Sequence, residues 1–343
     1  MPKKLLQTNL LLLLVAMIWG SAFVAQRLGM DSIGPLLFSG LRFILGALVV
    51  LPFLLYRRHA GKVSTPFLDQ SLLRGGFLLG LIVTAGINLQ QAGLLFTSVS
   101  HAGFITGMYV LMVPLLGLLI GLRTNTGTWL GVVLAMCGLY LLTVEDGFRI
   151  AGGDWLQLAS ALCWAVQVLV MGYLAKKHDP LRLAFIQFVT CAVFSLLAAL
   201  LLEPFSLPHI VQAAPALLYA GILSIGIAFS LQAIALQRAR PAHAAIILSL
   251  EGVFAAIAAA LFLGETLSVQ GYFGAALMLG AMLLAQLWPQ QPQPAPGTEP
   301  LHCLSTGPAA LPVSDGQTVV MDVATAPVPA AASADALPPD SDG

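Results

Sequence analysis

The stretch from Gly75 to Leu122, GGFLLGLIVTAGINLQQAGLLFTSVSHAGFITGMYVLMVPLLGLLIGL, contains no Asp, Glu, Lys or Arg in 48 residues. As one helix it would extend about 72 Å at about 1.5 Å per residue. The hydrocarbon core of a bilayer is only about 30 Å thick. The stretch therefore predicts two membrane-spanning helices joined by a turn.

The composition of the whole chain agrees with a membrane location. Of the 343 residues, 58% are hydrophobic and 9% are charged, and the mean hydropathy is +0.91. That is too little polar surface to cover a water-soluble globule of this size. Lys+Arg and Asp+Glu are equal at 15 each, so no strong field suggests a nucleic-acid partner. The four cysteines lack metal-ligand spacing, and we expect no metal, no cofactor and no catalytic residues.

Apolar segments of similar length recur along the chain, each near the about 20 residues that cross a bilayer as a helix. We therefore predict an all-α polytopic membrane protein with ten transmembrane helices and a disordered tail at 289–343 that is rich in Pro, Ala, Ser and Asp. The predicted spans are 8–26, 36–56, 72–91, 98–121, 127–144, 154–175, 181–202, 213–236, 242–263 and 267–287.

Basic residues predict the orientation in the membrane, because cytoplasmic loops retain Lys and Arg. With the N-terminus inside, twelve of the fifteen basic residues fall in cytoplasmic segments, and only Arg27 and Arg149 fall on the other side. We expect both termini to be cytoplasmic.

The second half of the chain repeats the first. The matched residues are Trp19, Pro35, Arg42 and Phe43 with Trp164, Pro180, Gln187 and Phe188, and then Gln90, His101, Gly103 and Gly107 with Gln232, His243, Ala245 and Ser249. We predict two five-helix repeats, at 1–147 and 148–288. Five is odd, so the two copies must have opposite orientations in the membrane. Inverted repeats around a central site are typical of secondary transporters, although duplication can also build a bundle without a pathway.

The repeated residues lie in motifs that carry a family resemblance over residues 8–287. These motifs are MIWGSAF (17–23), LRF (41–43), GMYVLMVP (107–114), LSLEGVF (248–254) and LGETLS (263–268). Together they resemble the drug/metabolite transporter superfamily, in particular its EamA-type ten-helix members. The resemblance implies two five-helix repeats and transport of a small solute. One departure is Gly252, where many relatives have proline.

Glu251 is the main candidate site residue, because no other charged residue lies within ten positions on either side. A charge at the bilayer centre costs at least about 2.5 kcal/mol and usually faces the bundle interior or a cavity. A cavity of low dielectric favours the protonated carboxyl, so Glu251 can exchange a proton or bind a cationic group. The alternatives are a structural pair with Arg42 or a cap on a broken helix.

Arg42 is the second embedded charge, with uncharged Gln187 at the matched position. It can bind a substrate carboxylate with two parallel hydrogen bonds. Its long stem can also let it reach the interface, which is the structural alternative.

The repeat places Tyr109 opposite Glu251, because each lies eight residues after its matched histidine. Pro114 removes one helical hydrogen bond, so we predict a helix break there. We place the second break at Gly252. Glycine lacks the ring clash of proline, so the sequence does not decide whether the helix kinks near Glu251.

Uncharged polar and aromatic residues complete the candidate set. Trp19 is either a cavity wall or a packing residue. Asn88, Gln90 and Gln232 either line a pathway or join helices by hydrogen bonds, and we favour the second role.

The sequence thus favours a secondary transporter that exports a small metabolite, amino acid or drug-like solute across the bacterial plasma membrane. Alternating access is the expected mechanism, and proton coupling is a further hypothesis. The expected partners are a small-molecule solute, protons and the lipid bilayer, with no nucleic acid; the oligomeric state is left open. The competing functions are an intramembrane enzyme, which needs a nucleophile with its base or a metal cluster, and a non-transporting membrane sensor.

Overall fold

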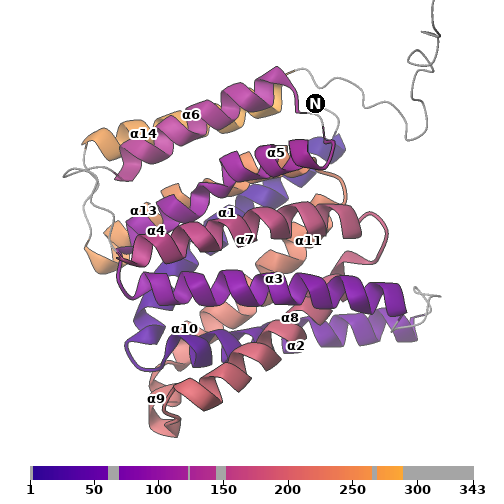
Figure 1. Ribbon diagram of the computed structural model, residues 1–343, viewed down its shortest axis with the longest axis vertical. Coiled ribbons are helices and arrows are strands. Elements are labelled where there is room, and N and C mark those ends of the chain that lie inside the picture. Colours follow the sequence, from indigo (N-terminus) through magenta and orange to yellow (C-terminus); the bar gives the residue numbers. More distant parts are fainter. Residues whose placement is uncertain (1–2, 61–68, 123, 144–151, 265–268, 289–343) are drawn as a thin grey trace, which may run out of the picture. The chain divides into compact units, whose positions relative to one another are not determined.

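The computed structural model describes residues 3–60, 69–122, 124–143, 152–264 and 269–288, which form helices and connecting turns without strands (Figure 1). Within these described ranges, eight helical segments of 18 to 26 residues are long and apolar enough to cross a membrane. Two further apolar helices, Thr126–Gly138 and Val269–Ala281, are shorter. The all-helical class of a polytopic membrane protein is therefore confirmed. The predicted disordered tail lies outside the described residues.

The helices follow the predicted spans closely, with three spans divided into shorter elements. In chain order they are α1 (Lys3–Met30), α2 (Pro35–His59), α3 (Gln70–Leu94), α4 (Val99–Gly107), α5 (Tyr109–Leu119), α6 (Thr126–Thr143), α7 (Gly152–Leu174), α8 (Pro180–Leu202), α9 (Leu207–Gln212), α10 (Ala214–Leu218), the π-helix η1 (Tyr219–Phe229), α11 (Ser230–Leu236), α12 (Pro241–Leu248), α13 (Glu251–Leu263) and α14 (Val269–Leu287).

Helices α2 and α8 both begin at a proline. Pro35 and Pro180 occupy the first helical turn, where the missing N–H leaves no helical hydrogen bond unmade. Before α8, the Asp179 carboxylate accepts hydrogen bonds from the N–H groups of Leu181 and Arg182, both at 3.1 Å. These local signals fix where each helix starts.

The pair α2 and α8 is tied together at both ends. At one end Arg57 donates to Asp179 at 2.9 Å. At the other end the Glu203 carboxylate accepts hydrogen bonds from the N–H groups of Leu36 and Leu37, both at 2.8 Å. A Cβ on Gly34 would lie 2.2 Å from the Glu203 carboxyl carbon, so the end of the Glu203 side chain would have to shift to make room for it. Glu203 thus supplies from α8 the cap that α2 lacks within its own sequence.

We expect Glu203→Ala to destabilise the protein. The first N–H groups of a helix have no partner within the helix, and losing a cap costs about 0.5 to 2 kcal/mol. Thermal unfolding of the purified protein in detergent, followed by circular dichroism, measures the effect. Glu203→Gln keeps one acceptor oxygen and should lose less. A Glu203→Ala protein as stable as the wild type would contradict this role.

Two predicted spans are broken near their middle. The span predicted at 98–121 is divided at Met108 into α4 and α5, and the span predicted at 242–263 is divided at Ser249 and Leu250 into α12 and α13. The break predicted at Pro114 is wrong, because Pro114 lies inside α5. Its missing N–H removes only the bond to the carbonyl one turn earlier, and the helix continues. The second break lies at Ser249 and Leu250, and Gly252, where the break is predicted, is the second residue of α13.

The predicted span 213–236 contains an element that the sequence pattern does not predict. Between α10 and α11 the backbone forms the π-helix η1 over eleven residues. Such helices are rare and often occur at functional sites.

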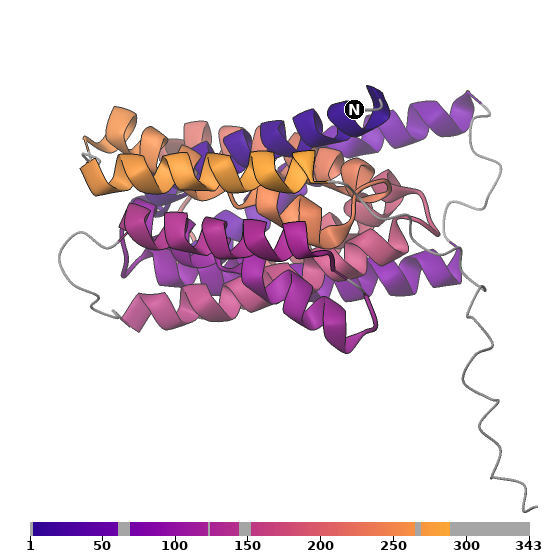
Figure 2. The ribbon, with the colours of Figure 1, turned by 90° about the horizontal axis from the view of Figure 1, so that it is seen from above.

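The arrangement of the helices separates a peripheral pair from a central group. Figures 1 and 2 show α6 and α14 side by side at one edge, while α2, α3 and α8 lie toward the opposite edge. Between them lie α1, α4, α5, α7 and α13, with α1 packed on α13 and α4 and α5 packed on α7. This central group surrounds the candidate site together with parts of α2, α3, η1 and α11.

Candidate functional site

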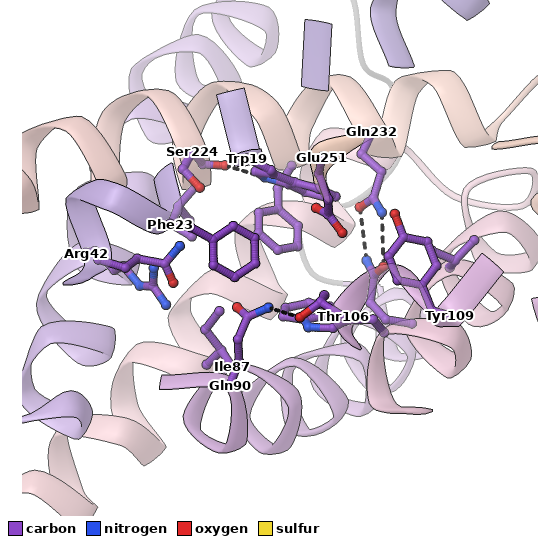
Figure 3. Close-up of a pocket in the computed structure, with 16 residues that line it drawn as sticks. Trp19, Phe23, Arg42, Ile87, Gln90, Thr106, Tyr109, Ser224, Gln232 and Glu251 are labelled. Atoms are coloured by element: carbon purple, nitrogen blue, oxygen red, sulfur yellow. Dashed lines mark hydrogen bonds between the residues drawn. The ribbon is translucent and has the colours of Figure 1, made fainter. Parts of the chain in front are cut away.

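A cavity of about 480 Å³, including space that opens outward, lies among the central helices (Figure 3). Its walls carry both polar and aromatic side chains. The lining residues are Trp19, Phe23, Gln26, Arg42, Ile87, Gln90, Thr106, Tyr109, Trp164, Gln167, Val168, Ser224, Ile225, Phe229, Gln232 and Glu251.

Each half of the chain supplies eight of these sixteen residues. Several of them are matched by the sequence repeat. The matched lining pairs are Trp19 with Trp164, Gln90 with Gln232 and Tyr109 with Glu251. The cavity is thus built where the two sequence repeats meet.

Glu251 is the first residue of α13, directly after the helix break, and only 4% of it is exposed. Its Oε1 atom makes no hydrogen bond of good geometry, and neither does the hydroxyl of Tyr109, the first residue of α5, although the two side chains interact with each other. Figure 3 shows the two side chains facing each other, close enough to interact electrostatically. A carboxylate at a helix N-terminus is stabilised by the helix dipole, so the break favours this position for an acidic group.

The position of α13 depends on close contact with α1. A Cβ on Gly20 would lie 2.5 Å from the Glu251 carbonyl oxygen and 2.5 Å from Phe254 Cβ. The absence of a side chain at Gly20 therefore allows α1 to approach the start of α13. Gly103 of α4 makes a similar approach to Gly252 and Ala255 of α13.

Arg42 lies in α2 and is 1% exposed. Its Nε and Nη2 atoms have no hydrogen-bond partner, and its guanidinium carbon lies 5.2 Å from the centre of the Phe38 ring and 5.9 Å from that of Phe43. Burial rules out the alternative in which Arg42 extends to the interface. Among the described residues neither Arg42 nor Glu251 forms a salt bridge, so the structural pairing of the two is wrong.

Aromatic rings gather around Phe229 of η1. Its ring centre lies 4.7 Å from that of Trp19 and 5.9 Å from that of Trp164. The Trp19 indole also donates to the Ser224 carbonyl at 3.2 Å. The two tryptophans therefore serve as cavity walls and as packing residues at once.

Amide side chains form a second polar feature of the cavity. The side-chain amides of Gln167 and Gln232 each donate to the side-chain oxygen of the other at 3.2 Å. The Gln90 side-chain amide donates to the Thr106 hydroxyl at 3.2 Å. The Gln157 side-chain amide donates to the backbone carbonyl of Gln90 at 2.9 Å. Gln90 and Gln232 thus both line the cavity and join helices.

The structure brings together Glu251, Arg42, Tyr109, Trp19, Gln90 and Gln232 from the predicted set, whereas Asn88, Gln187, Pro114 and Gly252 lie outside the cavity lining. Asn88 donates to Ser195 of α8 at 2.8 Å, which is the interhelical role. Gln187 is fully buried, and its amide atoms lack partners.

Sequence reasoning missed several polar lining residues: Gln26, Thr106, Gln167 and Ser224. Gln26 and Gln167 are amides inside apolar spans, the same signal that singled out Gln90. Thr106 and Ser224 carry no such signal, because small hydroxyl residues are common in membrane helices.

Comparisons with known proteins agree over nearly the whole helical part. Residues 6–144 and 151–287 match the EamA-like transporter family. An uncharacterized transporter of Archaeoglobus fulgidus is 32% identical over 289 residues, which are 83% of this chain and 87% of that protein. The threonine/homoserine exporter RhtA of Salmonella typhimurium is 34% identical over 149 residues, 40% of this chain and 47% of that protein.

A solved crystal structure without a functional name matches with a TM-score of 0.66. The match covers 81% of this chain and 96% of that chain at 20% identity. At that identity the likeness shows the fold alone.

Proposed function

This chain belongs to the EamA-like transporter family and is a membrane transporter, and we propose that it exports a small solute by alternating access. The observation that carries the proposal is the polar cavity to which both halves of the chain contribute equally. A site at the interface of two repeats can open to one side of the membrane and then to the other.

Ten transmembrane helices in two inverted repeats, 1–147 and 148–288, are part of the proposal. The helix breaks support this arrangement, because Met108 and Leu250 differ by the same 142 positions that separate His101 from His243. The packing supports it as well: α2 contacts α8 and α6 contacts α14, and each pair joins matched spans. The proposed orientation places both termini in the cytoplasm of a bacterium, as the loop charges favour.

Glu251 is proposed to bind either a proton or a cationic group of the solute. It is the one carboxylate among the cavity-lining residues, and it lacks a basic partner among the described residues. A carboxyl group that alternates between a proton and a cation couples the movements of the two in opposite directions. The substrate class includes amino acids, in line with the exporter name of one relative.

Transport is favoured over the competing functions by the relatives, which are named transporters or exporters. An intramembrane enzyme would need a nucleophile with a positioned base or a metal. The cavity lining offers one carboxylate and no histidine, cysteine or second acidic group.

Inside-out vesicles that contain the full-length protein test the proposal. With an acidic lumen, protons leave as solute enters, so amino acids or small organic cations should accumulate inside. We expect accumulation above that of vesicles without the protein, and its loss when a protonophore removes the gradient. Accumulation that ignores the gradient would refute proton coupling, and no accumulation of either solute class would refute their export.

A further inference from the structure

Two opposite charges in the cavity are buried without a charged partner. Arg42 has two unpartnered nitrogen atoms, Nε and Nη2, and Glu251 has an unpartnered oxygen atom, Oε1. Both side chains line the same cavity. Buried charges without partners are costly, which suggests that each awaits a group of opposite charge.

The two charges do not satisfy each other. In a low-dielectric interior they would attract strongly if they were within reach. Yet no salt bridge joins them in the described part of the chain, and Figure 3 shows the Phe23 ring between them. The walls of the cavity therefore hold the two charges apart, with apolar surface in between.

The helices that carry the charges are each held in place. Glu203 caps the start of α2, which carries Arg42. The close contact at Gly20 fixes the start of α13, which carries Glu251.

We propose that the solute carries a carboxylate at one end and an ammonium group at the other, separated by an apolar spacer. The carboxylate binds the guanidinium of Arg42, whose planar fork suits two parallel hydrogen bonds. The ammonium group binds Glu251 beside Tyr109. The spacer packs against Phe23, Trp19 and Phe229. This inference rests on the proposed transport function and names the class of its solute.

A solute with a single charge neutralises only one end of the cavity. An α-amino acid carries both charges on one carbon, so its carboxylate and its ammonium group lie closer together than those of a solute with a spacer between them. The cavity thus discriminates by the separation of the charges and not only by their presence.

Four six-carbon probes test this directly: 6-aminohexanoate, its isomer norleucine, hexylamine and hexanoate. Isothermal titration calorimetry of the purified full-length protein in detergent gives the affinities. We expect 6-aminohexanoate to bind at least about tenfold more tightly than each of the others, the factor expected for roughly one charge-assisted hydrogen bond. Norleucine is the sharpest control, because it has the same atoms and the same charges.

Two variants assign the ends of the solute. In Arg42→Gln, 6-aminohexanoate should bind no more tightly than hexylamine, and in Glu251→Gln no more tightly than hexanoate. The matched controls are Arg238→Gln and Asp31→Asn, which change exposed charges outside the cavity lining and should keep the wild-type order of affinities. The wild-type comparison stands even if a variant does not fold.

The outcomes separate this inference from the transport proposal. Norleucine or hexylamine binding as tightly as 6-aminohexanoate, or no binding of any probe, overturns the inference. Tight binding of 6-aminohexanoate without flux in vesicles upholds the inference and refutes transport of that solute. Flux of 6-aminohexanoate that is unaffected by Arg42→Gln upholds transport and overturns the inference.

Discussion

Replacing Glu251 by glutamine is expected to lower gradient-driven flux by roughly 100-fold, because losing one partner of a buried charged contact costs about 2 to 5 kcal/mol and about 1.4 kcal/mol is a factor of ten. The substitution keeps the size of the side chain and removes its charge. Flux into inside-out vesicles with an acidic lumen measures the effect.

Glu251→Asp keeps the charge and should retain part of the flux, while Asp31→Asn should retain all of it because Asp31 is exposed. If the glutamine variant transported at the wild-type rate with and without the gradient, Glu251 would instead serve only to begin α13 after the break.

Replacing Gly20 by alanine is expected to have the second largest effect. The new Cβ would lie 2.5 Å from the Glu251 carbonyl oxygen and 2.8 Å from the Ala255 nitrogen, and backbone atoms cannot rotate away. Overpacking of this kind costs about 1 to 3 kcal/mol. A shift of about 1 Å at a reacting group can lower the rate of an enzyme about 100-fold. We expect the flux to fall by a factor of about 10 to 100.

Gly280→Ala is the matched control, because the nearest atom to a Cβ there lies at 3.7 Å, an ordinary contact. Both variants are compared for flux and for the yield of folded protein in detergent. A Gly20→Ala protein with full flux would show that α1 and α13 are free to separate without moving the carboxyl group.

Much of the helical fold could be predicted because a bilayer demands long apolar segments, and these are visible in the sequence. The histidine register also placed Tyr109 and Glu251 at equivalent positions, and both begin a helix after a break. Pro114 was misleading because a proline can be accommodated within a membrane helix when neighbours satisfy the freed carbonyl.

The site was harder to predict than the fold. In a soluble protein, polar residues mark the solvent face of a helix, but lipid and protein interior are both apolar, so this signal is weak in a membrane. Asn88 and Gln90 are two positions apart in α3, yet only Gln90 lines the cavity. The π-helix η1 turns Ser224, Ile225 and Phe229 toward the cavity, and an α-helical register would have placed them differently.

The double attachment between α2 and α8 has a mechanical consequence. The contact of Arg57 with Asp179 and the cap that Glu203 places on α2 act like pins at the two ends of a rod. Two helices joined at both ends can rotate together, but sliding along each other would break the contacts at one or both ends. The pair would then move as one unit. The movement that exposes the cavity would occur at the two broken helices, α4 with α5 and α12 with α13.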